Sequence, residues 1–280
     1  MRTFVSAVAV LIGLAMAAVA VPAMWVDRNI VQEDGFVALT APLGKDPAFQ
    51  QRLAAAAVNN FSPDQIPESV VDLIRPVLED AAQSLTGLPG YPEAWTETLR
   101  KSHRLSFAAP DSLPAEMQGT SSLTLDVAPL VGLVAKRVAE ATSLPLESPE
   151  QVLITIGQPS QRQIVEQVSA YAPMGYAVAV GSAIAFLLAL VAARRRWTVL
   201  AGAGIGAVIL SALWVLAAEA VGRAVEEASS GNEVAEIFKR EFVAASTAGF
   251  GQWTLAAAVA GAVLLALGIV LRVAGGRGRS

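Results

Sequence analysis

The chain has 280 residues, of which 54% are hydrophobic and 16% are charged, and its formal net charge is −4. This composition is far more apolar than that of an ordinary soluble domain and indicates a membrane protein. The absence of cysteine excludes disulfides, thiolate nucleophiles, cysteine-ligated zinc, iron–sulfur clusters and lipid attachment at cysteine.

The first apolar run, residues 4–26, is long enough to cross a bilayer, which takes about 20 helical residues. Ala18 and Ala20 form the A-x-A pattern of a signal-peptide cleavage site. The run nevertheless continues to Val26 and is about twice as long as the apolar core of a signal peptide. We therefore expect residues 1–26 to form an uncleaved transmembrane anchor.

Residues 27–170 follow as a segment without a span, long enough to bury a core of its own. The sequence patterns of this segment mainly predict helices. Asp46 and Pro47 predict an N-cap and the first residue of a helix. Ser160 and Gln163 have capping-box spacing, and we expect the helix that they open to continue straight into the second span.

Two short runs in this segment are typical of strands: "SLTLDV" (residues 122–127) and "QVLITI" (residues 151–156). Between them, Leu130, Val134 and Val138 are spaced as on one face of a helix. The order strand, helix, strand favours a parallel pair with a crossover helix, that is, a two-strand β-α-β unit. The rest of the domain is expected to be helical.

The stretch "YPEAWTETLRKSHRLSFA" contains His103, the only histidine of the chain. Trp95, Leu99, His103 and Phe107 follow one another at intervals of four and therefore share one stripe of a helix. We expect the imidazole to lie at the edge of the buried face, beside Leu99, with one ring nitrogen hydrogen bonded. Trp95, Arg100 and His103 are the candidate binding residues of this helix, with a structural role as the favoured interpretation.

Catalysis is the alternative role for His103, with Asp126 of the first predicted strand as its carboxylate partner. A zinc protease helix needs two histidines, and no G-x-S-x-G motif is present to expose a serine nucleophile. We expect no metal site and no cofactor. The acidic residues Asp27, Glu33 and Asp34 are interpreted as solvated surface charge.

Three more apolar runs predict transmembrane helices: residues 171–193, 197–218 and 253–271. A turn (194–196) joins the first two, a loop (219–252) joins the last two, and a basic tail (272–280) follows. Within the loop, Val234, Phe238 and Phe242 share a helical face. This face predicts a helix that packs under the domain or lies on the membrane surface; a partner-binding helix is the alternative.

The charges that flank the spans indicate an orientation. All 24 acidic residues lie in segments 27–170 and 219–252, and none accompanies the arginines of the other segments, namely Arg2, Arg194, Arg195, Arg196, Arg272, Arg277 and Arg279. By the positive-inside rule, both termini and the arginine turn face the cytoplasm of a multi-pass bacterial plasma-membrane protein. The acidic excess on the outer side disfavours nucleic-acid binding.

The middles of the spans contain no charged residue, which disfavours a transporter or channel acting alone. Gly202 and Gly206 have the GxxxG spacing of closely packed transmembrane helices. Besides the lipid bilayer, we therefore expect contact with another envelope protein, or with a second copy of the chain through these glycines.

Three motifs carry a family resemblance: "APLGKDPAFQ" (residues 41–50), the W-x4-R-x2-H spacing of Trp95, Arg100 and His103, and "LTLDVAPL" (residues 123–130). In these motifs the chain resembles a group of uncharacterised actinobacterial integral membrane proteins. The resemblance implies an N-terminal anchor, a helical extracytoplasmic domain, C-terminal spans and a recurrent role for the Trp-Arg-His helix. It implies no known activity.

Together these patterns predict a mainly α membrane protein with four transmembrane helices and a mostly helical extracytoplasmic domain. The favoured function is non-enzymatic binding, sensing or scaffolding in the cell envelope. An extracytoplasmic enzyme that uses His103, and an accessory subunit of a transport or export complex, are the alternatives.

Overall fold

The structure is a computed structural model that describes residues 2–59, 84, 87–107, 124–142, 150–155, 160–228 and 233–277. The chain divides into two compact units. The first, here called the apolar bundle, comprises Met1–Arg28, Val168–Ala224 and Ser246–Ser280. The second unit comprises Asn29–Gln167 and Val225–Ala245.

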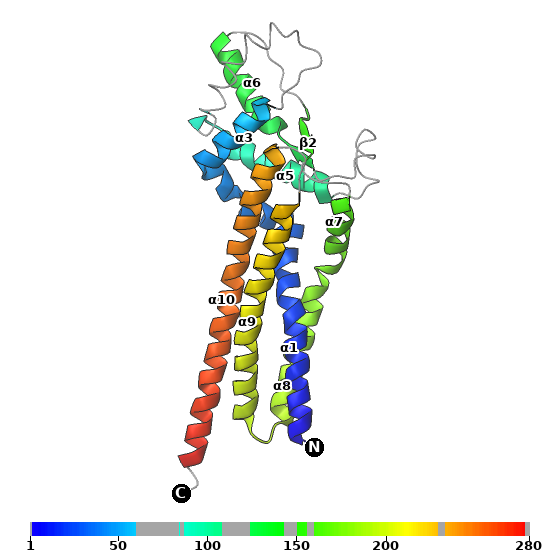
Figure 1. Ribbon diagram of the computed structural model, residues 1–280, viewed down its shortest axis with the longest axis vertical. Coiled ribbons are helices and arrows are strands. Elements are labelled where there is room, and N and C mark those ends of the chain that lie inside the picture. The colour runs from blue at the N-terminus through cyan, green and yellow to red at the C-terminus, as the bar shows by residue number, and fades with distance from the viewer. Residues whose placement is uncertain are drawn as a thin grey trace. The chain divides into compact units, whose positions relative to one another are not determined.

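Among the residues that the structure describes, four helices are long and apolar enough to cross a membrane, which confirms the four predicted spans. α1 (Arg2–Val26) continues into a π-helix, η1 (Asp27–Val31), and the other three are α8 (Met174–Ala192), α9 (Arg196–Glu227) and α10 (Glu233–Arg277). Within the apolar bundle these helices run side by side (Figure 1). α9 and α10 are longer than the predicted spans, since α9 continues to Glu227 and α10 already begins at Glu233.

α1 and α8 are joined by serine hydroxyl groups. Ser6 Oγ donates to the carbonyl of Ala189 over 3.0 Å, and Ser182 Oγ donates to the carbonyl of Gly13 over 2.8 Å. Both serines are buried. A buried hydroxyl between transmembrane helices needs such a partner, because lipid offers none, and it links the two helices in return.

Pro22 lies inside α1 and lacks the N–H that would bond to the carbonyl of Ala18, four residues earlier. The indole Nε1–H of Trp214, on α9, donates to this carbonyl over 3.1 Å. Trp214 is itself buried. A side chain from another helix thus satisfies the backbone group that the proline leaves unpaired.

α9 and α10 approach closely where both carry glycine. A Cβ on Gly204 would lie 2.6 Å from the carbonyl oxygen of Gly261, so neither position has room for a side chain. The two glycines of the predicted GxxxG pair differ: a Cβ on Gly206 would lie 2.3 Å from Leu14 of the same chain, whereas one on Gly202 would meet nothing within 4 Å. Gly206 therefore packs within the bundle.

The second unit begins with α2 (Glu33–Thr40), the 3-10 helix η2 (Ala41–Lys45) and α3 (Pro47–Asn59). Asp46 caps α3, since its Oδ1 accepts from the backbone N–H groups of Ala48 (2.9 Å) and Phe49 (3.2 Å). This cap confirms the prediction from the Asp-Pro pair. α5 (Tyr91–Phe107) and α6 (Ala128–Thr142) also contribute to the core of this unit.

The core of this unit combines segments far apart in the sequence: Phe49, Leu53, Tyr91, Trp95, Leu99, Leu130, Val234, Ile237 and Phe238. The last three belong to the start of α10, so the face predicted for that helix packs into the domain core rather than remaining free. An ion pair between Arg52 and Glu241 (2.9 Å) joins α3 to the same helix. The packed arrangement of the amphipathic helix is therefore confirmed.

Two strands flank α6, β1 (Thr124–Asp126) and β2 (Leu153–Thr155), but they pair antiparallel, with Leu125 opposite Ile154. The parallel pairing predicted from the strand, helix, strand order is wrong. The N–H of Val127, directly after β1, donates to the carbonyl of Val152, directly before β2, over 2.9 Å. The chain therefore enters β2 beside the end of β1, which makes the pair antiparallel.

α7 (Ser160–Tyr171) begins at the predicted residue but does not run straight into α8. A two-residue turn, Ala172 and Pro173, separates the helices. Proline lacks the N–H needed to continue a helix and disfavours helical geometry at the preceding residue. The uninterrupted helix predicted from Ser160 is therefore wrong at Pro173.

Candidate functional site

α5 carries most of the candidate site residues, and its sequence explains its position. The helix follows Gly90, whose φ of 87° lies in the left-handed region that glycine adopts readily. Its buried residues are Tyr91, Trp95, Thr98, Leu99, Ser102 and His103. They form one continuous face, which includes three of the four residues of the predicted stripe.

His103 is 5% exposed, and its Nε2 lies 3.0 Å from the carbonyl oxygen of Ile30. Because a carbonyl can only accept, Nε2 carries the proton and donates it. The ring stacks on Phe107 (centroids 4.3 Å apart, 14° between planes) and contacts Phe36 at 5.0 Å. The single histidine thus lies between two aromatic rings with one nitrogen committed to the backbone.

The carbonyl of Ile30 belongs to the last turn of the helix formed by α1 and η1, before the chain becomes extended at Gln32 (φ −77°, ψ 127°). Carbonyls in the last turn of a helix lack backbone partners along the helix. The His103 side chain supplies the missing donor from 73 positions further along the chain. Its hydrogen bond therefore closes a helix end.

Burial lowers the pKa of His103, and the carbonyl of Ile30 and the carboxylate of Glu33 oppose this shift without cancelling it. The neutral imidazole is consequently the stable form in the folded protein near neutral pH. A neutral ring that already donates from Nε2 keeps only Nδ1 as an acceptor.

Glu33 lies beside His103 and receives a fork of hydrogen bonds from Arg104: Nε to Oε2 at 2.8 Å and Nη2 to Oε1 at 3.1 Å. Arg100 approaches the same carboxylate at 3.8 Å. The Arg104 hydrogen bonds lower the pKa of Glu33. Glu33 remains a partly exposed surface charge, as predicted, and it also joins α2 to α5.

Asp27, by contrast, differs from the prediction. It is 3% exposed and lies in the first turn of η1, so it is not a solvated surface charge. The neighbouring sequence does not show this burial.

Asp126 is 2% exposed, and its carboxylate accepts hydrogen bonds from backbone N–H groups. Oδ1 accepts from the N–H of Ala128 (3.0 Å), at the start of α6, and from the N–H of Val152 (3.2 Å), just before β2. The N–H of Asp126 donates to Ser102 Oγ over 2.9 Å. One side chain therefore fixes the start of α6 and the point at which β2 meets β1.

His103 and Asp126, the candidate catalytic pair, have separate partners. Among the contacts of the described residues, none joins the two side chains. Ser102 and His103 are consecutive on α5, yet Ser102 contacts β1 while His103 contacts Ile30. The same described residues contain no group of three potential metal ligands.

Trp95 lies apart from Arg100 and His103, deep in the core. It is 2% exposed, packs edge-on against Phe49 (5.9 Å), and lies so close to Gly44 that a Cβ there would be 2.3 Å from the indole. Its Nε1 has no hydrogen-bond partner among the described residues. Of the predicted Trp-Arg-His set, the structure thus brings only Arg100 and His103 together, around Glu33.

Three residues that contact the candidate site residues were not themselves predicted as site residues: Glu33, Phe36 and Ser102. A signal existed for Glu33, because Arg100 and Arg104 are four residues apart on α5 and present two guanidinium groups on one face. The role of the Ile30 carbonyl had no such signal, since it depends on where a distant helix ends.

Comparison with known proteins adds no relative: no protein-family model, no curated protein and no solved structure matches the chain. The interpretation of the site therefore depends on its geometry.

Proposed function

We propose that this chain is a non-enzymatic integral membrane protein of the bacterial cell envelope whose second unit binds, senses or scaffolds another envelope component. The proposal rests on the hydrogen bonds of the two candidate catalytic side chains. His103 donates to the Ile30 carbonyl, and Asp126 accepts from two backbone N–H groups, both inside the core. Each is occupied in holding the fold.

The proposal includes an orientation, with both termini in the cytoplasm and the second unit outside it. Its support is the distribution of charge: exposed arginines at positions 194–196 form the turn between α8 and α9, and all 24 acidic residues lie in the two segments assigned to the outer side. We also propose that the chain belongs to the actinobacterial group. Only the three sequence motifs support this membership.

We further propose that α1 is retained in the mature protein. A cleaved signal peptide would remove the partners of Ser182 and Trp214, which donate to the Gly13 and Ala18 carbonyls. If the chain contacts a second copy of itself through the predicted GxxxG pair, Gly202 is the available member of that pair, because Gly206 faces Leu14 within the chain.

The test compares full-length protein in lipid nanodiscs with its His103→Gln and Asp126→Asn variants. Each is incubated with isolated cell-envelope material, and the released small molecules and the retained material are both analysed by mass spectrometry. We expect no released product that depends on His103 or Asp126, and retained envelope material with all three proteins. A product made by the wild type and lost in a variant of unchanged helicity and melting temperature would overturn the proposal.

A further inference from the structure

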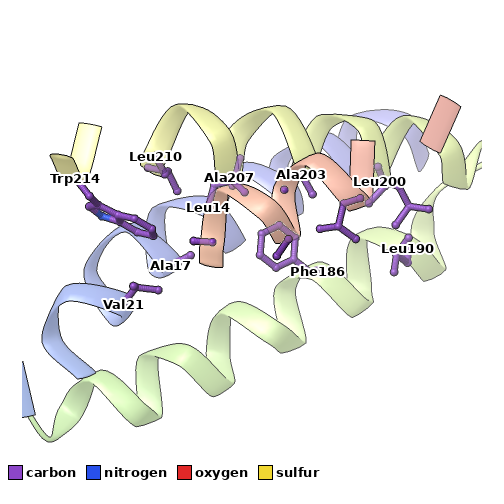
Figure 2. A pocket seen from close by; sticks show the side chains of 15 residues that line it. Leu14, Ala17, Val21, Phe186, Leu190, Leu200, Ala203, Ala207, Leu210 and Trp214 are labelled. Carbon is purple, nitrogen blue, oxygen red and sulfur yellow. The ribbon is translucent and has the colours of Figure 1, made fainter. Parts of the chain in front are cut away.

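The apolar bundle contains a cavity of about 310 Å³ that is lined by all four candidate spans. Figure 2 shows side chains of α1, α8 and α9 around it, including Leu14, Ala17, Phe186, Ala203 and Trp214. Its volume lies at the lower end of the range of small-molecule sites, about 300–1,000 Å³. It is therefore large enough to hold a ligand rather than a single solvent molecule.

The lining allows only one kind of ligand chemistry. Every lining side chain is apolar except for the indole N–H of Trp214, and that group donates to the Ala18 carbonyl. No lining side chain has a free donor or acceptor, and apolar cavities of this kind stay dry and take up hydrocarbon. The lining therefore suits a hydrocarbon group.

The cavity is also elongated. Its lining residues on α9 extend from Val199 to Trp214, which corresponds to about 22 Å of helix at 1.5 Å per residue. This length is a large part of the hydrocarbon thickness of a bilayer, about 30 Å. An extended acyl chain matches this shape better than a compact ring.

One end of the cavity lies next to a cluster of positive charge. Leu190 and Val199 line the cavity, and between them in the sequence are the exposed Arg194, Arg195 and Arg196, here called the arginine turn. Arg272 of α10 lies 4.9 Å from the ring centroid of Trp197, close to the same turn. Clusters of arginine beside spans attract anionic lipid headgroups.

From the shape, the lining and the adjacent charge, we infer that the apolar bundle binds one anionic phospholipid. One acyl chain occupies the cavity, and the headgroup phosphate lies at the arginine turn, where guanidinium groups can donate to its oxygens. This inference is independent of the proposed function and of which side of the membrane the arginine turn faces.

The test uses native mass spectrometry of the full-length protein, supplied with phosphatidylglycerol or with phosphatidylcholine of identical acyl chains. Ala203→Phe places a ring in the cavity, and Ala207→Leu is a milder filling variant should the first fail to fold. Ala212→Phe is the matched control, because Ala212 is exposed on the same helix and does not line the cavity.

The wild type and Ala212→Phe should retain one phosphatidylglycerol, and either cavity variant should weaken this binding at least about tenfold, equivalent to 1.4 kcal/mol. Replacing all three arginines of the turn with glutamine should abolish the preference for phosphatidylglycerol over phosphatidylcholine. Equal retention by the wild type and the folded cavity variants would overturn the inference, as would equal retention of the two lipids by the wild type. Retention of a free fatty acid in place of phospholipid would also overturn it.

Discussion

At the scale of single residues, two ring N–H groups complete the backbone of the first helix and its π-helical extension. Trp214 donates to the Ala18 carbonyl, freed by Pro22, and His103 donates to the Ile30 carbonyl, in the last turn of η1. Buried carbonyls without a donor are costly, about 1–3 kcal/mol each. Both aromatic side chains therefore have a structural role, since each avoids this cost by donating a hydrogen bond to a carbonyl.

His103→Phe should destabilise the protein by about 1–3 kcal/mol, because phenylalanine keeps the stack on Phe107 but cannot donate to Ile30. The measurement is the apparent melting temperature in mild detergent, with the exposed Glu93→Gln as a control. If His103→Phe melts at the same temperature as the wild type, the hydrogen bond does not stabilise the fold.

The same hydrogen bond predicts a pH dependence of stability. Burial lowers the pKa of His103 in the folded protein below its ordinary value of about 6.5, which applies to the unfolded chain. As pH falls through this value, the unfolded state binds a proton before the folded state does, so stability is lost. Glu33 stays charged in this window because its pKa is lowered.

The stability advantage of the wild type over His103→Phe should therefore be complete at pH 7.5 and should shrink as the pH falls below about 6.5. This stability advantage is measured from the melting temperatures of both proteins at several pH values between 7.5 and 5.5. An advantage that grows as the pH falls would show that the folded state favours the imidazolium, contrary to the account.

At the scale of elements, patterns within one segment were predictable and contacts between segments were not. The four-residue spacing from Trp95 to Phe107 predicted the buried face of α5, and Asp46 before Pro47 predicted the start of α3. The pairing of β1 with β2 was not predictable from the order of elements, because its direction depends on the hydrogen bonds that Asp126 and Val127 form with Val152.

Ion pairs between segments were unpredictable for the same reason. The pairing of Glu33 was not predicted, because its partner Arg104 lies 71 positions away in the sequence. The candidate catalytic pair has separate partners for a geometric reason: Ser102 and Ser106 of α5 form hydrogen bonds with β1, whereas His103 donates to the Ile30 carbonyl.

The pairing of Pro22 with Trp214 makes a prediction about α1 and α9. Trp214→Phe should cost about 1 kcal/mol in the Pro22 background, because the Ala18 carbonyl loses its donor. In a Pro22→Ala background the restored backbone N–H can take over, so the same substitution should cost less.

A double-mutant cycle of the four proteins, by unfolding in mixed detergents, measures this difference and cancels the loss of indole packing common to both backgrounds. An equal cost of Trp214→Phe in both backgrounds would mean that the indole N–H does not replace the missing backbone donor.

At the scale of the whole molecule, the sequence patterns predicted the number of spans, while the assembly of the second unit required the structure. The start of α10 is nearly 140 residues from Trp95 in sequence, yet Val234 and Phe238 belong to the same core. The amphipathic pattern alone left a partner-binding helix open as the alternative to the packed one, because the pattern shows which face is apolar and not what covers it.

The proposed orientation is directly testable because the chain contains no cysteine. Single cysteines at the exposed positions Lys45 and Glu93 should react with a membrane-impermeant maleimide on intact cells, whereas one at Arg195 should react only after permeabilisation. The reverse pattern would place the second unit in the cytoplasm and refute its proposed role in the envelope.

The central claim is that the only histidine is a buried, neutral hydrogen-bond donor and not a reactive group. Since the chain has one histidine, nitrogen NMR of histidine-labelled protein gives one pair of imidazole signals that need no assignment. The account predicts the Nε2–H tautomer at pH 7 and a pKa below the ordinary value. An imidazolium at pH 7, or the Nδ1–H tautomer, would contradict it.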